Sequence, residues 1–164
     1  MKLNTIPMLA LVLLLLAACG GEKPVDPKAP EAPGGLSRQT YVTGAEATAK
    51  ISEFHRRAKT LTNTWAASYG AGDRFWVFAA QYPTAEEALG AVNDMSRAAP
   101  MTGRYSAPIN KNIAYQAGLQ MRDSETNANI FFFAKQRWVV AAWVTIPSDM
   151  EIAVASIEWV PAGN

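Results

Sequence analysis

Few residues in this sequence could carry out catalysis. His55 is the only histidine, and an imidazole titrates near neutral pH, so His55 is the natural candidate for a general base. Its neighbours Arg56 and Arg57 supply no nucleophile, and no serine lies in the G-x-S-x-G pattern of a nucleophile elbow. An enzyme would have to bring His55 to a distant acid such as Asp73 or Asp94. We therefore expect no catalytic residues and no enzyme.

Metal ligands are equally scarce. A zinc site uses three or four histidine, cysteine or carboxylate ligands, and this chain has one histidine and one cysteine. The alternating acids and amides of residues 123–129 partly fit a calcium-binding loop. However, Ala128 replaces the glycine needed for its sharp turn, and Ala134 replaces its bidentate glutamate. The sequence predicts a solvated turn here, and neither a metal nor a cofactor.

The single cysteine, Cys19, lies where an apolar segment stops. Residues 3–18 carry no charge, and Lys2 precedes them. A membrane-spanning helix needs about 20 apolar residues, whereas this run is shorter and is interrupted by Pro7. The pattern is typical of a secretory signal peptide over residues 1–18. An uncleaved anchor helix and an ordinary cleavage site between small residues are the alternatives.

The residues Leu16-Ala17-Ala18-Cys19 resemble the lipobox of bacterial lipoproteins. This resemblance implies cleavage before Cys19, a diacylglyceryl group on its thiol and an acyl chain such as palmitate on the new amino terminus. Two or three such chains hold a protein stably at a membrane, where one holds it weakly. An aspartate after the cysteine commonly retains lipoproteins at the inner membrane, so Gly20 implies the outer membrane of the cell envelope. In an envelope with one membrane, the same anchor would face outward.

The segment after the cysteine is rich in proline. In "GGEKPVDPKAPEAPGG", prolines occur at every third position from Pro24 to Pro33. Polyproline II has three residues per turn and rises about 3.1 Å per residue. Residues 19–35 are therefore expected to be an extended spacer that holds a domain up to roughly 50 Å from the membrane. A ligand for a proline-binding module is the alternative.

Residues 36–164 have the length of one domain. Periodicity and turn residues predict these elements: a helix from 44 to about 69, a strand at 74–82, a helix at 84–99, strands at 113–121, 129–134 and 137–146, and a helix from 148 to about 159. Residues 148–160 also permit a strand. The expected fold class is α+β, with an antiparallel sheet of about four strands and helices packed on it, in the order α-β-α-β-β-β-α. This layout is similar to that of several small envelope lipoprotein domains, some of them MOG1/PsbP-like sandwiches.

Charge and aromatic content bear on the partner. Without residues 1–18 the chain has equal numbers of acidic and basic residues, which argues against nucleic acid as a partner. The aromatic residues exceed what a small core requires, so they form either a sandwich core or a groove. Binding residues concentrate on loops, and residues 100–112 form the longest loop. Arg104, Tyr105 and Lys111 on this loop are the expected rim of a groove.

Three functions follow from these observations. The first is a membrane-anchored envelope lipoprotein whose non-catalytic domain binds an envelope protein. The second is a carrier or sensor of a small apolar ligand, which would require a closed aromatic pocket. The third is a hydrolase with an unrecognised site.

Overall fold

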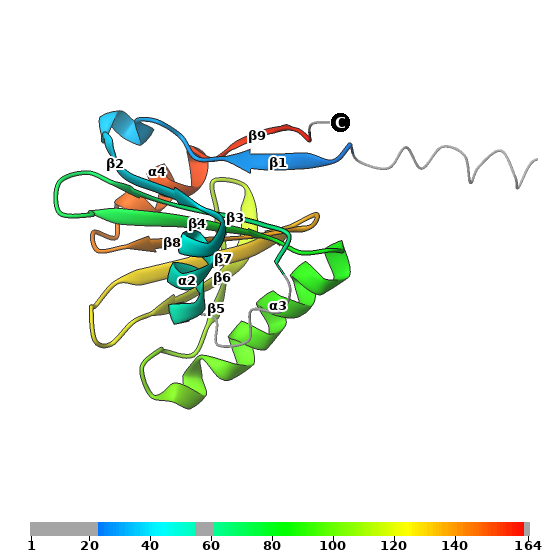
Figure 1. Cartoon of the computed structure of the whole chain (residues 1–164). Coiled ribbons are helices and arrows are strands. Elements are labelled where there is room, and N and C mark those ends of the chain that lie inside the picture. Colours follow the sequence, from blue (N-terminus) through cyan, green and yellow to red (C-terminus); the bar gives the residue numbers. More distant parts are fainter. Residues whose placement is uncertain (1–22, 55–60, 163–164) are drawn as a thin grey trace, which may run out of the picture.

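The computed structural model describes residues 23–54 and 61–162, and strands dominate this part of the chain. A seven-stranded sheet has the order β2-β3-β4-β8-β7-β6-β5, and β1 and β9 form a separate two-stranded sheet (Figure 1). All the pairings are antiparallel. The strands are β1 (Val25–Lys28), β2 (Arg38–Thr43), β3 (Asn63–Tyr69), β4 (Phe75–Gln81), β5 (Ile109–Ile113), β6 (Gln116–Arg122), β7 (Asn129–Lys135), β8 (Trp138–Val144) and β9 (Glu158–Pro161).

Three α-helices accompany the strands in the described residues. They are α2 (Gly44–Phe54), α3 (Ala85–Ala98) and α4 (Asp149–Ala155), and short 3-10 turns lie at η1 (Pro33–Gly35) and η2 (Pro100–Thr102). No helix within residues 23–54 or 61–162 combines the length and apolar character that a membrane crossing requires.

The expected fold class is therefore wrong. The structure is a β-rich fold with nine strands and three α-helices in its described part, not a four-stranded sheet with helices in the order α-β-α-β-β-β-α. The largest single error concerns residues 63–69, which were expected to continue a helix and instead form β3. This strand is buried on both faces and is rich in alanine, so it lacks the polar alternation that would distinguish a strand from a helix.

Other elements match the prediction more closely. Helix α3 begins with the expected capping box, because the Thr84 hydroxyl accepts from the Glu87 backbone N–H and the Glu87 carboxylate accepts from the Thr84 N–H. Strands β4, β7 and β8 lie where the apolar runs predicted them. At the C-terminal end both alternatives occur, since α4 is followed by β9. The expected loop at 100–112 contains η2 and most of β5.

Both faces of the large sheet are covered. Helices α2 and α3 pack on one face, and α4 with the β1–β9 pair packs on the other (Figure 1). Phe131 and Phe133 point to the β1–β9 side, while Phe132 between them points to the α3 side. All three rings are almost fully buried. Most of the aromatic surplus is therefore core, which explains how a central strand can be apolar at every position.

The proline-rich segment does not form the expected spacer over its described part. Residues 25–28 pair with β9, in a register that joins Val25 to Pro161 and Lys28 to Glu158. Pro33 begins the η1 turn and is buried. The backbone of residues 25–28 is extended, but it is a β-strand that lies on the domain and not a polyproline II rod that leads away from it. Residues 1–18 and Cys19 lie outside the described residues.

Candidate functional site

Strand β1 is held against the sheet by side chains that rise from the strands beneath it. The indole Nε1 of Trp65 donates to the carbonyl of Pro27 at 2.9 Å, and the Tyr69 hydroxyl donates to the carbonyl of Pro30 at 2.9 Å. Burial raises the pKa of Tyr69, so this hydroxyl keeps its proton and remains a donor. Prolines cannot donate a backbone hydrogen bond, but their carbonyls still accept. The proline segment is thus satisfied by donors from the sheet.

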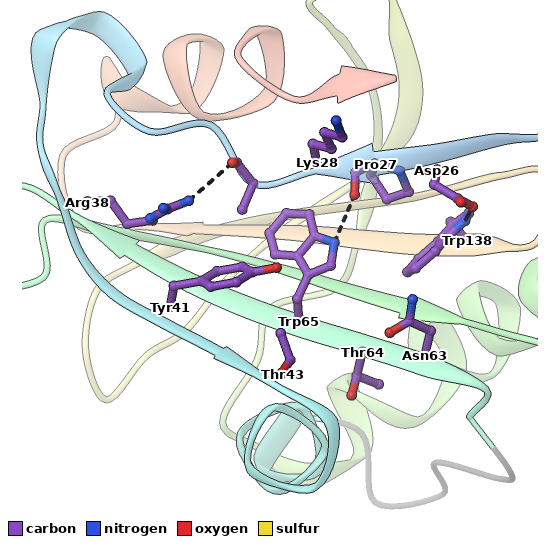
Figure 2. Close-up of a pocket in the computed structure, with 11 residues that line it drawn as sticks. Asp26, Pro27, Lys28, Arg38, Tyr41, Thr43, Asn63, Thr64, Trp65 and Trp138 are labelled. Atoms are coloured by element: carbon purple, nitrogen blue, oxygen red, sulfur yellow. Dashed lines mark hydrogen bonds between the residues drawn. The ribbon is translucent and has the colours of Figure 1, made fainter. Parts of the chain in front are cut away.

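A groove of about 340 Å³ lies between β1 and the strands β2 and β3 (Figure 2). We call it the β1 groove. Its lining comes from four strands and from the residue after β1: Asp26, Pro27, Lys28, Ala29, Arg38, Tyr41, Thr43, Asn63, Thr64, Trp65 and Trp138. Strand β1 forms one wall of the groove as it crosses this face of the sheet from Trp138 of β8, which donates to Asp26, to Trp65 of β3, which donates to Pro27.

The walls of the β1 groove are aromatic. Trp65 is almost completely buried beneath β1, whereas Tyr41 is 49 % exposed. In Figure 2, Tyr41 extends from β2 toward Trp65, and Asn63 points up toward β1. The guanidinium of Arg38 lies 4.8 Å from the centre of the Tyr41 ring, a distance typical of a cation–π contact. A flat or apolar group entering the groove would therefore meet aromatic surface.

Several polar groups of the β1 groove are available to a ligand. Within the described residues, no hydrogen bond engages the Tyr41 hydroxyl, the Asn63 amide or the Lys28 ammonium group. Asp26 is already used, since its carboxylate accepts from Trp138 Nε1 at 3.0 Å. This set of groups can bind and orient a ligand, but it contains neither a nucleophile with a base nor a set of metal ligands. No group of three His, Cys, Asp or Glu side chains within residues 23–54 and 61–162 could hold a metal ion.

The β1 groove runs beside a free sheet edge. Strand β2 has β3 as its one neighbour in the described structure. The backbone N–H of Arg38 is bound to the carbonyl of Glu31, but the outer edge from residue 40 to 43 has no partner strand in that part of the chain. Such an edge presents backbone donors and acceptors that a further strand could pair with.

The expected rim residues are only partly brought together. Arg104 and Tyr105 line a second hollow, of about 390 Å³, together with Gly103, Ser106, Arg122, Ser124 and Asn127. We call this hollow the Arg104 pocket. Lys111 lies elsewhere, on the edge strand β5, where it is exposed. A binding role for these three residues remains a prediction.

Arg104 is fully engaged with acids. Its guanidinium donates to both carboxylate oxygens of Asp123, the shortest distance being 2.6 Å, and it lies 3.3 Å from the carboxylate of Glu125. Burial alone would raise the pKa of Asp123. Hydrogen bonds from Arg104, Glu125 and Thr126, together with the charge of Arg104, outweigh burial and hold that pKa below its usual range. Asp123 is completely buried, so the turn expected to be solvated instead contains an internal ion pair.

Two other candidates cannot be placed. His55 and Cys19 both lie outside the described residues. Sequence reasoning missed Tyr41 and assigned Trp65 to a helix. Strand β2 does carry a signal in its composition, since Thr40, Tyr41 and Val42 are typical strand residues followed directly by Gly44.

Two comparisons of the sequence with known proteins found no match. The chain matches no protein-family model and no curated protein sequence.

Proposed function

We propose that this protein is a lipid-anchored lipoprotein of the cell envelope whose domain binds an extended segment of another envelope protein. The observation that carries the proposal is the position of the β1 groove, an aromatic groove that lies directly beside the free edge of β2. The domain acts as a binding module, not as an enzyme. The proposed location is the outer membrane, which follows from the lipobox-like residues and Gly20.

The edge and the groove serve different parts of such a segment. Added strands bind through main-chain hydrogen bonds at a sheet edge, while pockets on one face receive alternate side chains and give specificity. The backbone of β2 from residue 40 to 43 would supply the hydrogen bonds. Tyr41 and Trp65 would receive one apolar or aromatic side chain, and Asn63 would bind a neighbouring polar group.

The charges near the groove favour an acidic segment. Arg38 and Lys28 line it, and its one carboxylate, Asp26, accepts a hydrogen bond from Trp138. A basic rim steers an acidic partner and suppresses a basic one. We therefore expect the bound segment to combine one large apolar residue with an aspartate or glutamate nearby.

A photo-crosslinking amino acid at position 41 tests the binding site in the intact envelope. We expect position 41 to yield a discrete adduct, and we expect the same probe at Leu89, exposed on α3, to yield none. Arg38→Glu should reduce the adduct at 41, while the matched Arg97→Glu on α3 should not. Equal adducts from both positions, or an adduct insensitive to Arg38→Glu, would contradict the proposed site.

The anchor has its own test. Cys19→Ser should abolish incorporation of labelled palmitate and release the protein from membranes. Unchanged membrane retention of this variant would mean that residues 1–18 form an uncleaved anchor helix.

A further inference from the structure

One end of the large sheet lies beside Lys23 and Val25, where the described chain begins. Because β6 begins beside the point where β7 ends, the β5–β6 turn and the β7–β8 turn lie at the same end. The side chain of Gln136 in the β7–β8 turn accepts from the Val25 N–H and donates to the Lys23 carbonyl, both at 2.9 Å. The chain therefore enters the domain at this end, beside the β7–β8 turn (Figure 1). We call it the tether end.

The covalent distance from Cys19 to this point is short. Four peptide steps separate Cys19 from Lys23, and an extended chain advances about 3.5 Å per residue, so the reach is at most about 14 Å. The described structure has no proline spacer to add to this length, since residues 25–28 are paired with β9. A lipid on Cys19 would thus hold the tether end close to the bilayer surface.

The tether end carries groups that suit a membrane surface. Lys23 and Arg137 are exposed there, and Lys135 lies with its ammonium group 4.5 Å from the centre of the Trp159 ring. Tyr115, at the tip of the β5–β6 turn, is 99 % exposed. Tyrosine and tryptophan concentrate at the headgroup level of membranes, and basic residues are attracted to anionic lipids.

The opposite end of the sheet carries charges of both signs. Its β3–β4 and β6–β7 turns carry Asp73 and Glu125, and the basic residues Arg74 and Arg104 there are held in ion pairs with Asp149 and Asp123. The acid nearest to the tether end is Asp26, which follows Val25 and whose carboxylate accepts a hydrogen bond from Trp138 Nε1. The next are Glu86 and Glu87, in the first turn of α3. That helix covers the other face of the sheet, away from the β1–β9 pair.

We propose that the domain lies on the membrane with its tether end down, and that Lys23, Arg137 and Tyr115 contact the anionic headgroups of the bilayer. This inference rests on the proposed lipid anchor at Cys19. In this orientation the β2 edge and the β1 groove face sideways, along the bilayer. Without it, the domain would rotate freely on its lipid anchor.

Site-specific labels on the full-length lipoprotein test this orientation. Cys19 is acylated in the mature protein, so a second cysteine would be the one thiol open to labelling. A fluorophore is placed at Tyr115→Cys or, as the matched control, at Glu125→Cys at the opposite end. The protein is reconstituted in phosphatidylethanolamine–phosphatidylglycerol vesicles containing a lipid with a headgroup quencher. We expect quenching at 115 and little at 125.

Charge reversal tests the headgroup contact. Each basic side chain near an anionic membrane contributes about 1 kcal/mol, so Arg137→Glu should weaken the contact between the tether end and the vesicle surface roughly fivefold or more. It should also lower the quenching at 115 in the acylated protein. The matched Arg122→Glu, at the opposite end, should change neither. If Arg137→Glu is as silent as Arg122→Glu, the headgroup contact is refuted.

The anchor and the orientation fail in different ways. Flotation of the same vesicles, with Cys19→Ser as the comparison, shows whether the lipid holds the protein. Protein that floats but is quenched equally at 115 and 125 would overturn the orientation and leave the anchor standing. Protein that does not float would overturn both.

Discussion

The β1 groove and the Arg104 pocket are hollows of similar volume that differ in how their polar groups are satisfied. In the Arg104 pocket, the guanidinium of Arg104 is bound to Asp123, and the Arg122 guanidinium donates to the side-chain amide oxygen Oδ1 of Asn127. In the β1 groove, the Tyr41 hydroxyl and the Asn63 amide have no partner within the described residues. The first hollow is held together by its own charges, whereas the second keeps hydrogen-bonding capacity for another molecule.

This difference shows why charged residues on a loop are a weak guide to function. Arg104 and Tyr105 are on a surface loop, but the buried carboxylate of Asp123 accounts for the position of Arg104. The β1 groove has fewer charges and is the better candidate because its groups are not already paired. Substitutions in the two hollows should accordingly separate stability from binding.

The largest effect is expected in the Arg104 pocket. Asp123→Ala removes the buried acceptor of Arg104 and of the backbone N–H of Glu125. The free energy of unfolding should therefore fall by about 2 to 4 kcal/mol. Glu125→Ala is the matched control, because Glu125 is exposed and its ion pair should contribute less than about 1 kcal/mol. Urea unfolding measures both. Equal losses in the two variants would show that Asp123 does not anchor this region.

The Asp123 carboxylate also makes the free energy of unfolding depend on pH. Because the folded pKa of Asp123 lies below its usual value of 3.8, the ionised form is favoured by folding. Its contribution is complete above the unfolded pKa and is lost as the pH falls through the folded one. The stability advantage of the wild type over Asp123→Asn should therefore shrink below about pH 4. An advantage that is constant from pH 7 to pH 3 would contradict this assignment; urea unfolding at stepped pH measures it.

A smaller effect is expected where the β1 groove meets the core. Trp65→Phe keeps an aromatic ring but removes the donor to Pro27, so stability should fall by about 1 kcal/mol. The loss should be local, with faster amide hydrogen exchange in β1 and β9 than in β7. Uniform acceleration throughout the sheet would mean that the bond to Pro27 does not hold β1 in place.

The smallest effect on stability is expected at Tyr41. This side chain is half exposed, and Tyr41→Ala should change the free energy of unfolding by no more than about 0.5 kcal/mol. It should nevertheless weaken partner binding about tenfold or more, since aromatic anchors dominate binding energy. Thermal unfolding measures the stability, and titration with the partner identified by crosslinking measures the affinity. A stability loss as large as that of Asp123→Ala would identify Tyr41 as a core residue.

Elements with local signals could be predicted from the sequence. Helix α3 has a capping box and an apolar stripe, and both depend on residues within a few positions of each other. Strands β7 and β8 are long apolar runs joined by the short reversal at Gln136. Their boundaries follow from local chemistry, which a single sequence contains.

Elements that depend on distant partners could not be predicted. Strand β1 consists of residues that favour polyproline II in isolation, and Val25 is fixed by Gln136, 111 positions away. In strand β3, Trp65, Ala67 and Tyr69 face the β1–β9 side and Ala66 packs beneath α2. With apolar residues on both faces and several small ones, its composition resembles that of a helix. The β1 groove could not be predicted either, because β1 and β3 form it together and neither strand has a clear local signal.

The pairing of β1 with β9 also constrains the order in which the protein can fold. These are the first and last strands of the described chain, and contacts between distant segments form slowly because they close a long loop. A chain still emerging from a ribosome or a translocation channel would lack β9 until residues 158–161 were free. The β1–β9 pair would therefore form last. Truncation before Glu158 would leave β1 without its partner strand above Trp65 and Tyr69.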